Sequence, residues 1–397
     1  MENKNRMIAI LGLMAFLANG DNYAAAPLII NIAADLNITV SVAAMSVTAY
    51  MLAFGAFTLI FGPLSDRFGK VKIINIAAMG TAIFSILGAF SFNLPSLIFF
   101  RAMNGAFGAG IFPVTLAFVG QSFEPQHRQK AIGKVMGLMF MGGAMATIIG
   151  GTLAYLGSWR LVYLAYGIAE LVVALIMFKI LERDQPVVDH FHLIEAYKEP
   201  LSDFSFMKLV LTIFFVGFSV FGGFTYTGKL IQTVTGYNLF IVGAILSLFG
   251  VGTVIGGRIA PVLRKKLKGR FLVSAGVIGG ISLLGLAFSS NVWFLSLALF
   301  GYGVAFIFLQ STLITTVQEK LSKRRGTAMS LASFNMFVGG AIGTSVNAVV
   351  IDSGNLSTIY LNSAVILFLV SMVAAFFISQ FEASRQKEML EKNGECQ

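Results

Sequence analysis

The sequence has few of the groups on which disulfides, metal sites and covalent catalysis depend. Its 397 residues include one cysteine, Cys396, which lies in the polar C-terminal tail, and three histidines. Disulfides, Cys-ligated metal and thiol catalysis are therefore not expected. The histidines fall in segments between apolar runs, so a histidine-based proton relay is not expected either. The sequence predicts no metal and no cofactor.

Charge is also scarce. Charged residues make up 12% of the chain, against ~25% in a typical soluble domain. Hydrophobic residues make up 57%, and the mean hydropathy is +0.83. The net charge is +10, but the basic residues occur in short clusters between long apolar runs, which argues against nucleic-acid binding. The composition therefore indicates a protein embedded in a lipid bilayer.

Apolar runs long enough to cross a membrane recur along the whole chain. A helix needs about 20 residues to cross ~30 Å of hydrocarbon. The first run follows MENKNRM directly and has no small-residue cleavage site, so it is predicted as a retained span and not a signal peptide. Twelve spans are predicted, near 7–32, 41–63, 71–92, 95–120, 131–155, 161–181, 206–229, 239–261, 271–289, 292–317, 327–350 and 358–380.

The basic residues predict the orientation of these spans. If the N-terminus is inside, all but three of the 28 Lys and Arg residues fall in inner loops, tails or inner helix ends. The exceptions are Arg101, Arg160 and Lys229. Both tryptophans, Trp159 and Trp293, then fall at the outer boundary, where an aromatic belt is expected. We therefore expect a multi-pass protein of the plasma membrane with both termini in the cytoplasm.

Two pairs of segments repeat at a distance of about half the chain. Residues 128–147 align without a gap with 325–344, and residues 54–62 align with 249–257. Duplicated six-helix halves are a known plan of secondary transporters, with the substrate site between the halves. The predicted fold is all-α, with twelve transmembrane helices in two pseudo-symmetric six-helix bundles. The predicted units are a first bundle at 1–181, a cytoplasmic central loop at 182–204, a second bundle at 205–381 and a cytoplasmic tail at 382–397.

The stretch GPLSDRFGKVK, residues 62–72, resembles the loop signature between spans 2 and 3 of the major facilitator superfamily. Its matching residues are Gly62, Asp66, Arg67, Gly69 and Lys70. The resemblance implies that Asp66 docks on the start of span 11, near Gly326 and Thr327, and latches the inner side closed. Arg67 and Lys70 would complete the charge network. A plain positively charged inner loop is the alternative.

The stretch RAMNGAFGAGIFPVTLA, residues 101–117, resembles the span-4 motif of the twelve-span drug:proton antiporters in this superfamily. Arg101, Gly105 and Pro113 match, while Asn104 stands in place of the usual Gln. In span 5, Ala146 and Thr147 replace the Gly-Pro step of the antiporter signature, which weakens the assignment to this branch. The resemblance implies proton-coupled export, with spans 1 and 4 lining the cavity of the first half.

Asp21 is an acid in the middle of the first span, where a carboxylate is energetically expensive. At 1.5 Å per residue, Asp21 and Arg101 both lie ~9 Å below the outer face. The resemblance places spans 1 and 4 along the same cavity, so the two side chains are expected to meet, which would make both tolerable in a low dielectric. Asp21 is the predicted proton carrier and Arg101 its partner. A static ion pair without proton turnover is the alternative.

Several other polar residues fall inside predicted spans. Glu170, in span 6, is either a second proton site that faces the bundle or a protonated packing residue. The remaining polar residues either contact substrate in the cavity or bond helices to one another. This predicted substrate-cavity set comprises Asn22, Tyr23, Asn104, Tyr226, Tyr302 and Asn335.

Taken together, the sequence predicts a proton-coupled exporter of small lipophilic or drug-like molecules that works by alternating access. Its expected partners are a small-molecule substrate, protons and the bilayer, and it is expected to be monomeric. A proton-coupled transporter of a polar metabolite, such as a sugar or an amino acid, is the nearest alternative. A membrane enzyme is disfavoured because neither H-E-x-x-H nor G-x-S-x-G occurs. A channel would need neither the repeat nor the latch.

Overall fold

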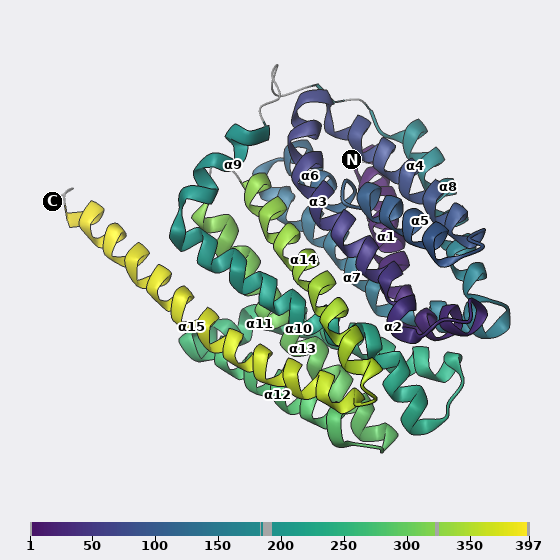
Figure 1. Cartoon of the computed structure of the whole chain (residues 1–397). Coiled ribbons are helices and arrows are strands. Elements are labelled where there is room, and N and C mark those ends of the chain that lie inside the picture. The colour runs from purple at the N-terminus through teal and green to yellow at the C-terminus, as the bar shows by residue number, and fades with distance from the viewer. Residues whose placement is uncertain (1, 183, 186–192, 322–324, 395–397) are drawn as a thin grey trace.

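The computed structural model describes the chain except for residues 1, 183, 186–192, 322–324 and 395–397. Helices make up nearly all of the described part, as Figure 1 shows. The helices of the first half are α1 (Glu2–Asp35), α2 (Val40–Ala43), α3 (Met45–Phe68), α4 (Lys70–Ala89), α5 (Leu94–Gly108), α6 (Phe112–Ser122), α7 (Pro125–Leu156) and α8 (Trp159–Ile180). The later helices are α9 (Leu193–Ser202), α10 (Phe204–Thr235), α11 (Leu239–Leu267), η1 (Lys268–Arg270), α12 (Phe271–Phe288), α13 (Val292–Lys320), α14 (Arg325–Asp352) and α15 (Leu356–Gly394).

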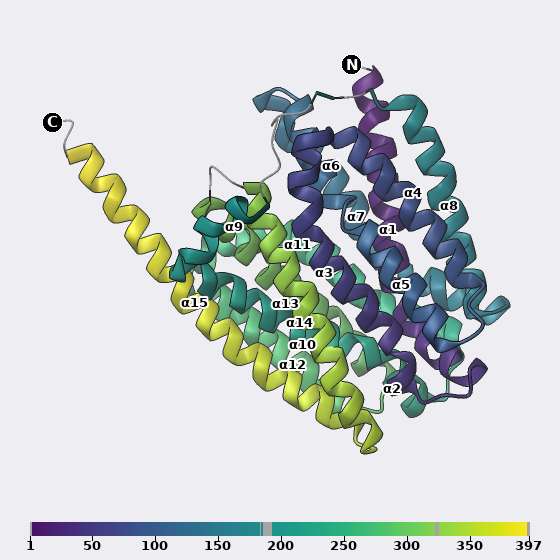
Figure 2. The same ribbon diagram turned by 45° about the horizontal axis from the view of Figure 1, so that its top comes forward.

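Within the described residues, eleven helical runs are long and apolar enough to span a membrane. One of them, Leu239–Phe288, is 50 residues long, and a single helix of that length would measure ~75 Å. The 3₁₀ turn η1 divides this run into the two helices α11 and α12. The all-α membrane fold is thus confirmed, and the predicted spans match these helices. Both chain ends lie at the upper end of the molecule in Figure 2.

The two halves of the chain repeat the same close helix contacts. A Cβ added to Gly142 of α7 would lie 2.1 Å from the backbone oxygen of Phe16 of α1. A Cβ added to Gly339 of α14 would lie 2.0 Å from the backbone oxygen of Phe214 of α10. Gly142 and Gly339 are equivalent positions of the sequence repeat. The repeat therefore corresponds to one helix-packing arrangement that is built twice, with glycine allowing close backbone approach.

Two long helix pairs join the halves, α3 with α14 and α7 with α11. Just before α3, the hydroxyl of Ser41 in α2 donates a 2.6 Å hydrogen bond to Asp352 at the end of α14. Towards the other end, a Cβ added to Gly62 of α3 would lie 3.2 Å from the Ser330 hydroxyl. Together, α2 and α3 therefore contact α14 along most of its length.

The predicted central loop contains a helix, α9, that lies against α3, α10 and α14. The Tyr197 hydroxyl donates a 2.8 Å hydrogen bond to the backbone oxygen of Leu59 in α3. Burial raises the pKa of Tyr197 to about 12, so the hydroxyl stays protonated near neutral pH and remains a donor. This helix was missed in the sequence because the charged segment around it contains no long apolar run.

Gly105 fixes the distance between α5 and α3. A Cβ on Gly105 would lie 2.3 Å from the backbone oxygen of Tyr50. Gly105→Val should therefore lower the free energy of unfolding by about 1–3 kcal/mol, because α5 has to move away from α3. The measurement is reversible unfolding in mixed micelles, followed by circular dichroism.

The matched control is Gly120→Ala in α6, where an added Cβ meets nothing within 4 Å. This variant should be neutral, or more stable by up to about 1 kcal/mol. Equal stability of the wild type and Gly105→Val would show that this backbone approach does not limit the packing.

Candidate functional site

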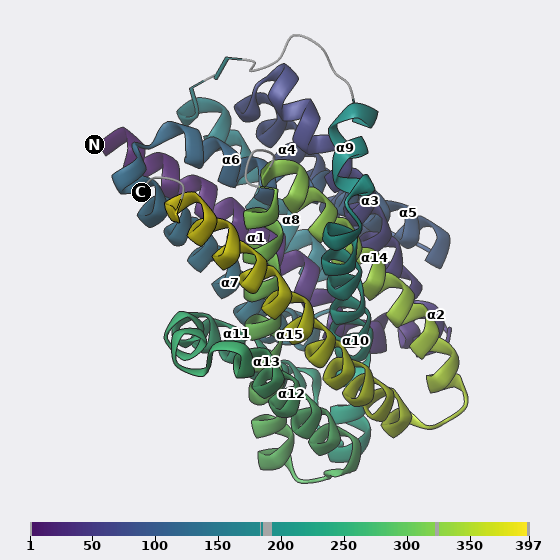
Figure 3. The ribbon, with the colours of Figure 1, turned by 90° about the vertical axis from the view of Figure 1, so that its left-hand side faces the viewer.

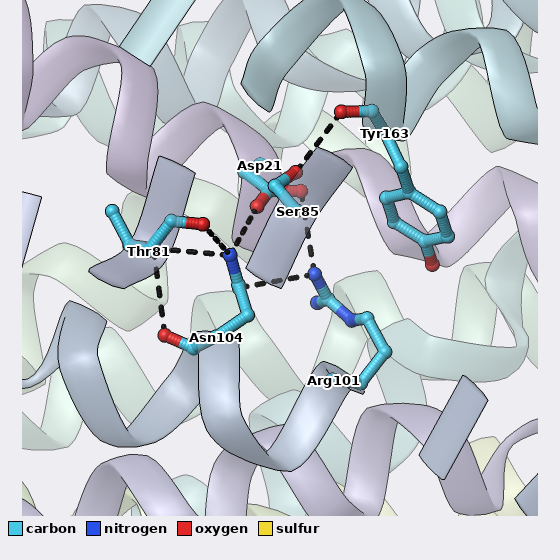
Figure 4. A network of polar contacts seen from close by, with 6 residues as sticks. All are labelled: Asp21, Thr81, Ser85, Arg101, Asn104 and Tyr163. Atoms are coloured by element: carbon cyan, nitrogen blue, oxygen red, sulfur yellow. Dashed lines mark hydrogen bonds and ion pairs between the residues drawn. The ribbon is translucent and has the colours of Figure 1, made fainter. Parts of the chain in front are cut away.

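A buried polar network connects three helices inside the first half, as Figure 4 shows. Arg101 donates a 3.3 Å hydrogen bond to one carboxylate oxygen of Asp21, and the Asn104 amide donates a 3.0 Å bond to the other. Asp21 is 1% exposed and Arg101 2% exposed. The Asn104 amide also donates to the backbone oxygen and the hydroxyl of Thr81, both at 3.0 Å. The expected meeting of Asp21 with Arg101 is therefore seen, with Asn104 as a third member.

Two aromatic rings enclose the Arg101 guanidinium. Its central carbon lies 4.5 Å from the ring centre of Tyr50 and 5.1 Å from that of Tyr163. The Nε and one Nη of Arg101 are buried without a hydrogen-bond partner among the described residues. Because the rings attract the cation through their faces, Arg101 stays held even while part of its hydrogen-bonding capacity is unused.

Small residues bring these groups together. Gly105 lets α5 approach α3, which places Arg101 over Tyr50. A Cβ added to Gly20 would lie 2.7 Å from the Tyr166 ring, so α1 and α8 also meet closely beside Asp21. The network therefore lies among α1, α4 and α5, and α3 and α8 pack beside it.

A central cavity between the halves lies on the other side of Tyr50, which both lines this cavity and stacks against Arg101. Tyr50 therefore separates the ion pair from the cavity. Aromatic side chains from both halves dominate the lining: Tyr23, Tyr50, Phe54, Phe112, Phe140, Phe221, Phe249, Phe306 and Phe337. The polar residues of the lining are Asn19, Asn22, Thr253, Gln310 and Ser333.

Two of the six predicted cavity residues, Asn22 and Tyr23, line this cavity. Asn104 lies in the buried network instead. The hydroxyl of Tyr226 donates to the backbone of Thr344, and that of Tyr302 donates to the backbones of Ser219 and Val220; both tyrosines are fully buried. The Asn335 amide donates to Leu331 of its own helix. The hydroxyls of Tyr226 and Tyr302 thus bond one helix to another, and the Asn335 amide bonds to its own helix.

Sequence reasoning missed four polar residues of the cavity lining, Asn19, Thr253, Gln310 and Ser333. The Asn19 amide donates to the backbone oxygen of Met139, and the Gln310 amide donates to the Met336 sulfur at 3.5 Å. The Gln310 side-chain oxygen is buried without a partner among the described residues. For Asn19 one signal was available: it lies three residues before Asn22 on the same helix, and residues three apart share a helix face.

Glu170 is fully buried in α8, one turn from Tyr166. Neither of its carboxylate oxygens has a hydrogen-bond partner among the described residues, and the Tyr166 hydroxyl has none either. Asp21 and Arg101 lie close enough to interact with it electrostatically. Glu170 therefore faces the interior of the bundle, and not lipid.

The predicted latch residues lie at the turn between α3 and α4. Gly69 has a φ of +89°, which a residue with a side chain rarely adopts. Asp66 accepts a 3.0 Å bond from Lys70, and Arg67 lies over the ring of Phe68 at 4.9 Å. Gly62 of α3 faces Ser330 of α14, one helical turn from Gly326 and Thr327.

The carboxylate at the N-terminus of α4 belongs to Asp184 and not to Asp66. The two oxygens of Asp184 accept hydrogen bonds from the backbone amides of Lys70 and Val71, at 2.8 and 2.9 Å. Such a carboxylate satisfies free amides and is favoured by the helix dipole. Asp184 follows α8, more than 100 residues away in the chain, so no local pattern in the sequence could predict this contact.

A duplicated bundle of membrane-spanning helices around an aromatic cavity, with a buried acid and arginine beside it, defines a membrane transporter. The family model described as Major Facilitator Superfamily matches residues 11–344, and the chain belongs to this superfamily. It is a multi-pass protein of the cell membrane, and as a transporter it binds a small-molecule substrate.

Several known proteins are similar to it. An uncharacterized MFS-type transporter of Bacillus subtilis, YceJ, is 22% identical over 95% of this chain and 97% of its own. The puromycin resistance protein pur8 of Streptomyces alboniger is 34% identical over 35% of this chain and 28% of its own. A triacylglyceride transporter of Mycolicibacterium smegmatis is 27% identical over 46% of this chain and 34% of its own.

The fold is also similar to that of a solved structure. A bacterial homologue of the human lysosomal transporter Spinster, crystallised in an inward-facing and unoccupied conformation, superposes with a TM-score of 0.74. It covers 94% of this chain and 96% of that chain at 17% sequence identity. At this identity the likeness concerns the fold.

The Asp21–Arg101 pair gives a prediction about stability. Arg101→Leu should lower the free energy of unfolding by about 3–5 kcal/mol, because it leaves a buried carboxylate without its counter-charge. The double variant Asp21→Asn/Arg101→Leu should recover most of this loss. A thermodynamic cycle with the single variant Asp21→Asn measures the coupling in mixed micelles. Additive losses in the double variant would mean that the two charges do not depend on each other.

Proposed function

We propose that this chain is a proton-coupled secondary transporter that exports small lipophilic molecules by alternating access. The observation that carries the proposal is the position of the Asp21–Arg101 pair directly behind Tyr50 of the aromatic cavity. Substrate in the cavity and a proton on Asp21 would thus be separated by one side chain. The two events can influence each other through that ring.

The cavity supports the choice of substrate class. Nine aromatic side chains and few polar groups suit a lipophilic molecule better than a sugar or an amino acid, which needs many hydrogen bonds. Two of the similar proteins carry names that point the same way, one for puromycin resistance and one for triacylglyceride transport. These names describe those proteins and support a lipophilic substrate here.

In the proposed coupling, Asp21 exchanges a proton as the cavity opens to one side and then to the other. When Asp21 is ionised, Arg101 and Asn104 hold it. When it is protonated, Arg101 loses its counter-charge but keeps the faces of Tyr50 and Tyr163. Water that reaches the pair favours the ionised state, so opening and closing of the cavity changes the proton affinity of Asp21.

Glu170 is the second acid in this proposal. It is buried near Asp21 and has no hydrogen-bond partner among the described residues, so a full negative charge there would be poorly compensated. We assign it a protonated resting state from which it exchanges protons with Asp21. Arg101 is then the single cation shared by two acids.

The turn at residues 62–72 is proposed as the inner latch. Gly62 lies against Ser330 of α14. Asp66 belongs to α3, which contacts both α14 and α9. Asp184 fixes the start of α4. Asp66, 50% exposed and paired with Lys70, is free to exchange this partner for groups at the start of α14 when the halves rock. In this proposal, residues 1–181 and 205–381 are the rocking units of a monomer in the bilayer.

The coupling is tested by Asp21→Asn in reconstituted vesicles. Under an imposed pH gradient, with a panel of lipophilic cations, neutral drugs and small metabolites, the wild type should accumulate lipophilic compounds against their gradient. The variant should lose this accumulation by about 100-fold or to background, because Asn cannot carry a proton. Undiminished uphill transport by a folded Asp21→Asn variant would contradict the coupling role.

The latch is tested by Asp66→Ala in a Cys396→Ser background that carries Ser333→Cys in the cavity lining. Loss of the latch should destabilise the inner-closed state. Turnover should then fall several-fold, and a water-soluble thiol reagent should modify Ser333→Cys faster from the inner side. Lys72→Gln in the same turn serves as the control. Equal labelling rates with and without Asp66 would count against the latch.

A further inference from the structure

A groove on the side of the molecule borders the central cavity. It lies between α1, α7 and α11, whose order across the molecule can be followed in Figure 3. Phe140 and Thr253 line both the groove and the cavity, so the two spaces adjoin at these side chains. The groove is also lined by Ile8, Gly137, Met141 and Val254. A molecule in the groove would therefore have to pass Phe140 and Thr253 to reach the cavity.

The groove exists because α7 and α11 touch along only part of their length. Small residues recur every seven positions on both helices, at 137, 144 and 151 and at 243, 250 and 257. Two of the three pairs of small residues bring the helices into close contact. A Cβ added to Gly250 would lie 2.1 Å from the Cα of Ala144, and one added to Gly151 would lie 3.1 Å from the Cα of Gly243. In the same register Gly137 faces Gly257, but a Cβ added to Gly137 meets nothing within 4 Å.

The flanks of the groove carry exposed apolar side chains. Met141 of α7 is 43% exposed, and Ile255 and Ile259 of α11 are similarly exposed. In a membrane protein such side chains on an outer helix face contact lipid. The groove is therefore open to the hydrocarbon of the bilayer, at the end of the helices where α7 begins and α11 ends.

Two cations stand in this otherwise mostly apolar lining, Lys134 of α7 and Arg258 of α11. Lys134 lies nine residues after the start of α7, and Arg258 lies nine residues before the end of α11. Because the two helices are antiparallel in this register, the two residues lie across the groove from each other at nearly the same depth. Both are exposed, and among the described residues neither forms an ion pair. The groove thus combines an apolar floor with two uncompensated positive charges at its rim.

We propose that this groove is the entry site for an anionic amphiphile taken from the inner leaflet of the membrane. The anionic headgroup binds between Lys134 and Arg258, and the apolar chain lies past Met141 towards Phe140 and the cavity. Long basic side chains reach the headgroup level while their stems cover apolar surface, and a guanidinium binds carboxylates or phosphates with two parallel hydrogen bonds. The inference rests on the proposed function and narrows its substrate class.

The experiment measures equilibrium binding, so it needs neither a proton gradient nor the native substrate. The full chain is placed in phosphatidylcholine nanodiscs, and empty nanodiscs provide the baseline. Three probes carry the same dansyl fluorophore: 11-(dansylamino)undecanoic acid, its methyl ester, and dansylglycine. We expect the long-chain acid to bind at least about tenfold more tightly than its neutral ester and than the short acid.

The double variant Lys134→Gln/Arg258→Gln should weaken binding of the long-chain acid about tenfold and leave the ester unchanged. Unchanged ester binding also shows that the variant is folded. The control Lys266→Gln/Lys268→Gln removes the same charge from the same end of α11 but outside the groove, and it should change neither probe. Equal binding of acid and ester to the wild type, or equal losses in both double variants, would overturn the headgroup assignment.

Gly137→Leu should fill the groove and weaken both long-chain probes about tenfold, because the apolar chain loses its space. Gly280→Leu on α12, where an added Cβ also meets nothing within 4 Å, is the control and should have no effect. Dansylglycine binding as tightly as the long acid would show a site for soluble anions, and would overturn the amphiphile assignment.

Failure of this inference and failure of the proposed coupling give different results. If charge-selective binding is absent while uphill transport still depends on Asp21, the entry site is wrong and the transporter assignment stands. If charge-selective binding is present while Asp21→Asn transports normally, the entry site stands and the coupling role is wrong.

Discussion

The structure depends on keeping one carboxylate and one guanidinium out of water together. Asp21 and Arg101 come from helices that are 80 residues apart in the chain, and each would be strongly destabilising alone at this burial. Asn104, Thr81, Tyr50 and the close approaches at Gly20 and Gly105 all serve to hold this pair. Because the pair joins α1 to α5, its charge state bears directly on the packing of the first half.

The ion pair lies beside the cavity and is connected to the other half of the chain through aromatic rings. Tyr50 presents one face to the guanidinium and also borders the cavity, and its ring stacks on Phe54, which in turn stacks on Phe337 of the other half. A change at the ion pair therefore reaches the interface between the halves through three rings. Aromatic packing of this kind has few alternative arrangements, which favours discrete states over gradual deformation.

The two interfaces between the halves differ, although the repeat relates them. On one side, α2 and α3 contact α14 from Ser41–Asp352 to Gly62–Ser330, whereas the α7–α11 contact stops after two of its three pairs of small residues. The difference leaves a groove beside the cavity on the α7–α11 side. Pseudo-symmetry in the sequence thus allows an asymmetric structure.

The sequence by itself determined the membrane class, the spans and the repeat, because backbone polar groups in lipid must be satisfied within helices and only long apolar runs permit this. It also predicted that Asp21 and Arg101 meet, since helix rise gives both residues one depth and the resemblance to the superfamily places spans 1 and 4 along one cavity. Only the tertiary structure decided which way each side chain faces: Tyr226 and Tyr302 bond backbones and do not line the cavity, and Asp184 caps α4. Rotation about a helix axis is set by packing against neighbours, and a nearly uniform apolar sequence contains little information about it.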